Sequence, residues 1–563
     1  MKQDSLANAL NRRDFIRRAA CAAVGTAAMG KCLRDLHFIN AALAQGPFSD
    51  YKALVCIFLS GGNDSNNLII PTIPGEWSNY SSIRTPVLAI PNADGGLATA
   101  QALSSLGSDG HTYGLNPAMY ELARIFNQYS GGGTDTRVFN DLGKVAPVLN
   151  AGPLVYPLTK AQYNANTVAK PPQLFSHADQ VTQWQTSIPD QPPSTGWGGR
   201  MADLLHSANP VNGTSGLDVL STCITIAGTN TFEVGASVQQ YSVGTGGIVS
   251  LSNPSNPSTA TTARDAALKA ILKSDKLLPN QYTSSYANAL DNTIATGQGL
   301  SGGLSQSQMA SYWTTAANWT WQDPTTLAVG AINQVRTPNG GSTFTSSLMQ
   351  QLNMVAQIIE AGQRASGVSG GLGMKRQIFF VTVGGYDTHT GQTNNAGQTT
   401  TNNAAVVIGS QANLLAELSQ SIWCFQKALK QIGITYADTN FVNRVTCFTA
   451  SDFGRTFPSN GLGSDHGWGT HQIVVGGAVN GQKTYGSFPT LAVNGPDDTS
   501  TGRWIPTTSV DQYAGTLAKW MGVSSSNIGA VFPNLSRFPG SYAGGYVPYY
   551  TSPGVATIAS FMT

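Results

Sequence analysis

Three separate stretches of the sequence pass from an apolar, strand-like run into an acidic residue. Asp64 follows KALVCIFL and a Gly-Gly pair, Asp387 follows QIFFVTV and a second Gly-Gly pair, and Asp452 follows VTCFTA and one serine. Runs that are apolar at nearly every position indicate strands covered on both faces, as in the parallel sheet of an α/β protein. Open α/β sheets place their sites outside the carboxyl ends of the strands. We therefore expect these three acids to meet at one edge of one sheet.

Helical patterns alternate with the strand-like runs. Leu348–Ala361 precedes the Asp387 strand, Leu414–Ile432 precedes the Asp452 strand, and Val510–Met521 closes the series. Such alternation predicts an α/β fold with a mostly parallel central sheet flanked by helices. At 563 residues the chain exceeds what one compact core usually holds, so we expect one large domain with a sizeable insertion, or two domains.

Residues 217–338 interrupt the alternation with Ser-, Asn- and Pro-rich segments and carry no acid of the same kind at a strand end. We interpret them as an inserted cap region. The remaining chain divides into 45–216 and 339–540, the two parts of the α/β domain, and 541–563, a tail lying on the surface.

The N-terminus indicates export. Two arginine pairs lie within NRRDFIRR, an Ala-rich apolar stretch follows, and Ala42-Leu43-Ala44 fits a cleavage site. We interpret residues 1–44 as a twin-arginine signal peptide, so the export machinery that recognises such signals is an expected partner. The alternative is a short basic amphipathic helix. The mature chain is expected in the periplasm or outside the cell.

Charge and hydropathy exclude two classes of partner. Only 11% of the residues are charged, the formal net charge is +2, and Lys and Arg do not cluster beyond the N-terminus, which argues against nucleic acid. No other stretch approaches the ~18 apolar residues that a membrane span needs. The mature chain is therefore expected to have no integral membrane segment.

Histidines and further acids lie close to two of the strand ends. Imidazoles and carboxylates gathered at strand ends bind divalent metals, and two such metals activate an oxygen nucleophile and neutralise a phosphoryl or sulfuryl group during transfer. Zinc, calcium, magnesium and manganese all remain possible. The candidate ligands are Asp64, Asp387, His389, Asp452, Asp465, His466 and His471.

Several motifs together resemble those of the domain of unknown function 1501 family. They include FLSGGNDSNNLIIP, YGLNPAMYELARIF, FSHADQ, TGWGGR, VGGYDTHTGQ, TASDFGRT and SDHGWG, in that order. The family is similar to the superfamily of alkaline phosphatases, sulfatases and phosphopentomutases. The resemblance covers nearly the whole chain apart from the insertion and the tail. It implies an alkaline phosphatase-like fold and a metal-dependent site.

The resemblance also implies roles for particular residues. Asp64 resembles a ligand of one metal, and Asp387 with His389 resembles the Asp and His of the other. Asp452 resembles the acid of a strand-end Asp-His pair, with His466 as the later histidine. Phe453 stands where relatives place the histidine of that pair, which brings the second metal into question. The alternative register takes Asp465-His466 as the pair and His471 as the last ligand.

Three residues are candidates for catalysis. Ser176 precedes a predicted helix whose N-terminus, together with a metal, would activate its hydroxyl as a nucleophile; the alternative is a helix N-cap. His177 is expected to bind substrate or to orient this turn. Arg455 is suited to holding an anionic group through two hydrogen bonds, or to pairing with an acid as a structural residue.

Together these features predict an exported hydrolase of a phosphate or sulfate ester, with a serine nucleophile and one or two divalent metals. Its substrate would be an anionic ester. The alternative is a catalytically inactive relative that serves as a binding or assembly component at the cell surface.

Overall fold

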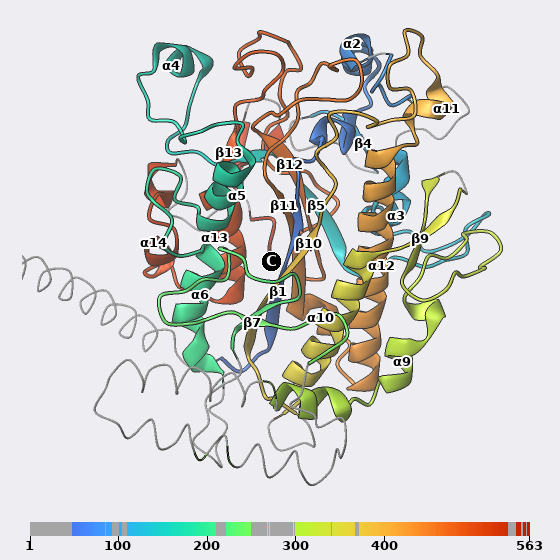
Figure 1. The fold of residues 1–563 in the computed structure, drawn as a ribbon, viewed down its shortest axis with the longest axis vertical. Helices are drawn as coiled ribbons and strands as arrows, with labels where there is room; N and C mark the ends of the chain where they lie inside the picture. The colour runs from blue at the N-terminus through green and yellow to red at the C-terminus, as the bar shows by residue number, and fades with distance from the viewer. Residues whose placement is uncertain are drawn as a thin grey trace, which may run out of the picture.

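The computed structural model of the chain defines a central sheet with helices on both faces (Figure 1). It describes most of the chain from residue 48 onward, including both predicted parts of the α/β domain. The described residues are 48–84, 86–92, 101–103, 110–209, 221–248, 267, 270, 297, 299–338, 341–365, 371–538, 548–552, 555–558 and 560–563.

The sheet has eight strands in the order β13-β5-β12-β11-β1-β10-β6-β7, and all but one run in the same direction. β12 is the exception, because it lies antiparallel to β11 and to β5. The prediction of an α/β protein with a mostly parallel sheet is therefore confirmed. The strands are β1 (Lys52–Leu59), β5 (Lys144–Gly152), β6 (Cys223–Thr225), β7 (Tyr241–Ser242), β10 (Arg376–Val383), β11 (Val445–Ser451), β12 (Thr470–Gly476) and β13 (Thr508–Ser509).

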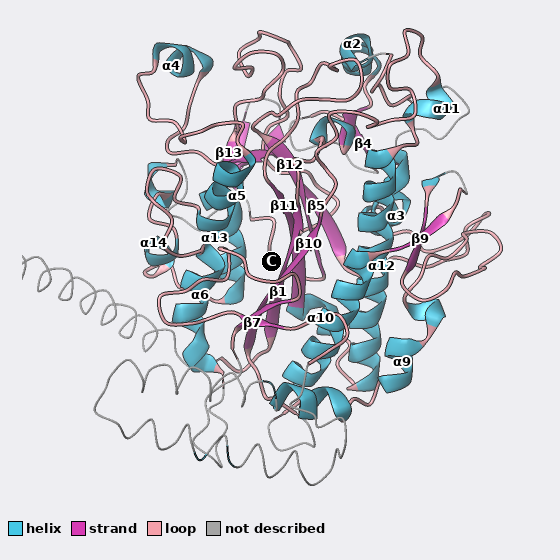
Figure 2. Ribbon diagram, viewed as in Figure 1, coloured by secondary structure: helices cyan, strands magenta, loops and turns pink. Residues whose placement is uncertain are grey.

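Alternate residues of β1 enter two different hydrophobic cores. Leu54, Cys56 and Phe58 pack in the core shared with α6 (Trp197–Leu205) and α13 (Val510–Met521). Val55, Ile57 and Leu59 pack in the other core, beneath α3 (Tyr120–Phe126), α10 (Ser347–Gln363) and α12 (Ser410–Thr435). Figure 2 shows the two helix layers with the sheet between them. A strand buried on both faces has no polar side, which explains its nearly continuous apolar sequence.

The remaining helices and strands are short. The helices are α2 (Pro74–Arg84), α4 (Lys160–Ala165), α5 (His177–Thr186), α9 (Ala310–Thr314), α11 (Asn403–Val406) and α14 (Ile528–Val531). The single-turn helices are η1 (Ser65–Asn67), η3 (Pro117–Met119), η4 (His206–Ala208), η5 (Ala316–Asn318), η7 (Phe441–Arg444) and η8 (Leu535–Arg537). Small sheets contain β2 (Ile69–Pro71), β3 (Gln101–Ala102), β4 (Tyr113–Leu115), β8 (Gln334–Arg336), β9 (Thr343–Thr345), β14 (Pro548–Ser552) and β15 (Val555–Ile558).

The predicted signal peptide, residues 1–44, lies outside the described residues. Of the predicted cap region, residues 221–248 add β6 and β7 to one edge of the central sheet, while most of 249–298 lies outside the described residues. The end of the predicted tail is anchored, because Phe561 is fully buried beside Tyr485 and Tyr513. Within the part of the chain that is described, no helix is both long and apolar enough to cross a membrane.

Candidate metal centre

The three central strands end level with one another. Leu59, the last residue of β1, lies opposite Val383 at the end of β10 and Ser451 at the end of β11. Because the strands are parallel, the loops that carry Asp387 and Asp452 leave the sheet at the same edge. This register brings together side chains that lie far apart in the sequence.

The double glycine after β1 lets these loops approach closely. Gly61 has φ +118°, and a Cβ there would lie 2.4 Å from the backbone nitrogen of Asp387. Gly62 has φ +82°, and a Cβ there would lie 2.3 Å from the ring of Phe453. A larger residue at either position would be strained in the left-handed region and would push the loops apart.

Three histidine side chains converge at this edge with the carboxylate of Asp387. His466 Nε2 lies 3.1 Å from His177 Nε2 and 2.9 Å from His389 Nε2. Asp387 Oδ1 lies 3.2 Å from His389 Nε2 and 3.4 Å from His466 Nε2, and its Oδ2 lies 3.5 Å from His177 Nε2. We call His177, His389, His466 and Asp387 the histidine cluster.

The other ring nitrogen of each histidine already has an acceptor. His177 Nδ1 lies 2.7 Å from Asp452 Oδ2, and His389 Nδ1 lies 3.0 Å from Asp465 Oδ1. His466 Nδ1 lies 2.8 Å from the carbonyl oxygen of Phe175. A carboxylate or carbonyl oxygen only accepts, so each neutral imidazole carries its proton on Nδ1 and presents the Nε2 lone pair.

The lone pair of His466 Nε2 faces those of His177 and His389 at 3.1 Å and 2.9 Å, and these contacts are repulsive unless a cation lies among them. The ligand atoms of His177, His466 and Asp387 all lie within 4.8 Å of one another. A proton on His466 Nε2 would not suffice, because a single N–H serves only one of its two neighbours. Burial also lowers the pKa of His466, which disfavours the protonated ring. Imidazoles whose second nitrogens are held by carboxylate or carbonyl oxygens are the usual ligands of transition metals. The residues of the histidine cluster therefore fit a divalent transition metal.

Arg455 holds the Asp387 carboxylate in place. Its side chain is fully buried, and its Nη1 donates to Asp387 Oδ1 at 2.6 Å and to the carbonyl oxygen of Gly61 at 3.2 Å. Partial burial raises the pKa of Asp387, but the hydrogen bond and the charge of Arg455, together with the nearby His389 and His177, outweigh it, so the net pKa is lowered. Arg455 therefore keeps Asp387 ionised and oriented.

Two aromatic residues fix the histidine rings. The ring of Phe453 lies 4.7 Å from those of both His177 and His466. Phe175 has φ +72°, a left-handed conformation that is costly for an aromatic residue. Its carbonyl oxygen is the acceptor for His466, and its ring lies 4.5 Å from the guanidinium of Arg503. Backbone strain of this kind is found mainly at functional sites, and it persists where the surrounding structure holds the strained residue in place.

Ser176 lies at the start of α5, directly before His177. Its hydroxyl donates to Asp179 Oδ2 at 2.6 Å and makes no hydrogen bond to the helix backbone. The hydroxyl therefore has a carboxylate as proton acceptor, one residue away from a histidine of the cluster.

Two of the sequence-predicted ligands are placed differently. Asp64 is fully buried and forms an ion pair with Arg84, which is also fully buried. His471 accepts a hydrogen bond on Nδ1 from the backbone nitrogen of Asn150 at 2.9 Å, and its ring stacks on Phe488. Among the described residues, neither side chain has a contact with the histidines of the cluster. Asp452 and Asp465 reach the cluster through His177 and His389.

The buried position of His471 predicts a pH dependence of stability. Burial lowers its pKa to about 3, so the ring stays neutral in the folded protein at pH 5 while the unfolded chain binds a proton below its pKa of about 6.5. The contribution of His471 to stability is therefore fully present above pH 6.5, and it is lost as the pH falls toward 3. Between pH 7 and pH 5, the free energy of unfolding of the native protein should fall by about 2 kcal/mol more than that of His471→Gln. Urea unfolding of both proteins at each pH measures this, and equal falls would contradict it.

The role of Asp452 can be tested by changing one atom. Asp452 Oδ1 accepts from the backbone nitrogen of Gly61 at 3.0 Å, and Oδ2 faces His177 Nδ1. In Asp452→Asn the retained oxygen can keep the Gly61 bond while the new NH₂ group donates to His177, which moves the ring proton to Nε2. Zinc affinity should fall by about 10–100-fold. Zinc titration measures it, with Asp141→Asn, in an exposed ion pair with Lys430, as the control that should be unchanged.

The place of His177 in the cluster is the main feature that sequence reasoning did not reach. Its only signal was its position next to Ser176 in FSHADQ, which indicated substrate binding or a structural turn. Asp387, His389 and His466, by contrast, were all among the predicted ligands and lie together. Local sequence did not show that α5 starts opposite Asp452.

Comparison with known protein families gives a match for the chain. A family model described as "Protein of unknown function (DUF1501)" matches residues 51–530, which include all four members of the histidine cluster. No curated protein matches the chain.

Proposed function

The chain belongs to the DUF1501 family of proteins of unknown function, and from the geometry of its histidine cluster we propose that it is an exported, metal-dependent hydrolase of a phosphate or sulfate ester. One divalent transition metal would be held by His177, His389, His466 and Asp387. The proposal includes an alkaline phosphatase-like arrangement of the sheet and twin-arginine export to the periplasm or beyond.

One observation carries the metal part of this proposal. Each of the three imidazoles has its Nδ1 committed to an oxygen acceptor, and their Nε2 atoms meet at 2.9 Å and 3.1 Å. Imidazole nitrogen suits zinc and other transition metals, whereas calcium and magnesium prefer oxygen ligands. Zinc is therefore favoured over the calcium and magnesium that the sequence left open.

The described residues agree better with one metal than with two metals. Asp64, the predicted ligand of a separate metal, is paired with Arg84, and Phe453 occupies the place expected for a further histidine. The side chains of the histidine cluster are also partly exposed, with Asp387 at 45% and His389 at 39%, so solvent and a substrate can reach them.

The charge of the centre favours an anionic substrate. Asp387 contributes one negative charge against two on the metal, and the adjacent Arg455 adds a positive one. When bound, the metal would act as a Lewis acid that polarises an ester oxygen. Asp452 and Asp465, which accept from the outer ring nitrogens of His177 and His389, bring the total to zero. The favourable charge is therefore that of the metal itself, which a phosphate or sulfate group would contact directly.

Ser176 is the proposed nucleophile. Its oxygen would attack phosphorus or sulfur while its proton passes to Asp179 Oδ2, the acceptor that it already contacts at 2.6 Å. The bond from phosphorus or sulfur to the ester oxygen would break, and the leaving alcohol would take up the proton held by Asp179. Water would then release phosphate or sulfate from Ser176.

The test is metal analysis followed by turnover. The mature chain should hold about one equivalent of zinc, and after chelation and reconstitution it should hydrolyse an aryl phosphate or an aryl sulfate. Ser176→Ala should retain zinc and lose turnover. Less than about a tenth of an equivalent of any divalent metal after reconstitution would refute the metal site. Full zinc binding without turnover of either ester would instead support the alternative, a binding or assembly component at the cell surface.

A further inference from the structure

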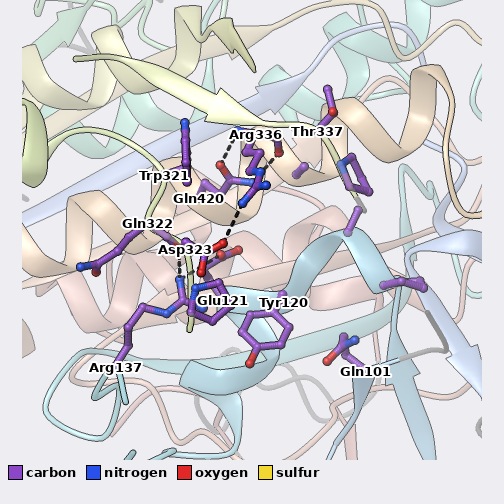
Figure 3. A pocket seen from close by; sticks show the side chains of 15 residues that line it. Gln101, Tyr120, Glu121, Arg137, Trp321, Gln322, Asp323, Arg336, Thr337 and Gln420 are labelled. Carbon is purple, nitrogen blue, oxygen red and sulfur yellow. Dashed lines mark hydrogen bonds and ion pairs between the residues drawn. The ribbon is translucent and has the colours of Figure 1, made fainter. Parts of the chain in front are cut away.

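A second cavity lies apart from the histidine cluster, and no residue of that cluster lines it. It is formed by the start of α3, one face of α12, the segment from Trp321 to Pro324 and the end of β8 (Figure 3). Its volume is about 270 Å³. This is near the lower end of the range for ligand pockets, which limits an occupant to about the size of one sugar ring.

Two ion pairs are built into the wall of this cavity. Arg336 Nη1 donates to Asp323 Oδ2 at 2.9 Å, and Arg137 Nη1 lies 3.5 Å from Glu121 Oε1. Both members of the second pair are more than nine-tenths buried, at 6% and 7% exposure. The four charges of the lining sum to zero. Behind them Asp135, 3.0 Å from Arg137, is balanced by Arg124 at 3.9 Å, so an ion gains no net attraction here.

The cavity offers hydrogen-bonding groups that are already held in position. Glu121 Oε2 accepts from the Ser419 hydroxyl at 2.9 Å, whereas Oε1, among the described residues, has only the longer 3.5 Å contact with Arg137. Arg137 is fixed in turn, since it also donates to the carbonyl oxygen of Gln322 at 2.8 Å. Glu121 Oε1 therefore keeps capacity to accept a hydrogen bond from a ligand hydroxyl.

Aromatic surface completes the lining. The rings of Tyr120 and Trp321 border the cavity, and Arg336 lies over the Trp321 ring at 4.8 Å. Figure 3 shows these rings and the paired charges among the side chains that line the cavity. Apolar ring surface beside fixed donors and acceptors suits a ligand that has both C–H faces and hydroxyl groups.

We propose that this cavity binds a neutral sugar unit. Its zero net charge disfavours phosphate, sulfate or a uronic acid, and its volume admits one ring. The site is separate from the proposed ester hydrolysis and does not depend on it.

The test is binding of neutral methyl hexosides to the mature protein, measured by ligand-observed NMR and calorimetry. Methyl glucoside, galactoside and mannoside serve as probes, with methyl glucuronide as the anionic comparison. At least one neutral hexoside should bind. Glu121→Gln should weaken it by about tenfold, because a hydrogen bond to a charged acceptor becomes a neutral one.

A second variant keeps the test valid if Glu121→Gln fails to fold. Pro338→Trp places a large side chain on the partly exposed rim of the cavity and should abolish binding, whereas Pro192→Trp, at an exposed proline outside this cavity, should leave it unchanged. Circular dichroism and zinc content should match the native protein in all variants. Absence of binding by every neutral hexoside, preference for the glucuronide, or full binding by either cavity variant would overturn the proposal.

Discussion

Replacing His466 by alanine should lower zinc affinity by at least about 100-fold. His466 contacts both of the other imidazoles. Its Nε2 lies 3.1 Å from His177 Nε2 and 2.9 Å from His389 Nε2. Its loss therefore removes one proposed metal ligand and the central member of the cluster. Competition with a chromophoric chelator at fixed pH measures the zinc dissociation constant directly.

The matched control for this prediction is His111→Ala. His111 is a partly exposed histidine that contacts Glu76, and neither residue belongs to the cluster. Its replacement should leave zinc affinity unchanged. If His466→Ala bound zinc as tightly as the native protein, the assignment of the cluster as a metal centre would be wrong.

Breaking the ion pair of Asp64 with Arg84 should produce the largest loss of stability. Both side chains are fully buried, and Arg84 Nη1 also donates to the carbonyl oxygen of Phe457 at 2.6 Å. Arg84→Met leaves the Asp64 carboxylate buried without its cation, which should lower the free energy of unfolding by about 3–5 kcal/mol. Chemical denaturation at pH 7 measures the difference.

An exposed ion pair provides the comparison. Arg444 contacts Asp438 at 2.6 Å, but its side chain is 38% exposed. Arg444→Ala should therefore change the free energy of unfolding by less than about 1 kcal/mol. A loss in Arg84→Met no larger than this would show that Asp64 does not need its partner and would reopen a ligand role for it.

Much of the fold could be predicted from periodicity and strand boundaries. The predicted helix Val510–Met521 matches α13, and the predicted helices 348–361 and 414–432 lie within α10 and α12. These helices are long and most of their residues are buried, so local pattern and tertiary packing agree. The reversed direction of β12 was harder to predict, because an apolar strand has the same pattern in either direction.

At the site, the sequence by itself determined which acids and histidines leave the sheet at strand ends. Asp387 and Asp452 followed from the apolar runs before them, since parallel strands share one edge. Only the tertiary structure decided which polar atoms meet: it paired Asp64 with Arg84, buried His471 against Phe488 and set His177 beside Asp452. These contacts join residues that are distant along the chain, and their geometry depends on how α5 and the loops pack, which no local pattern encodes.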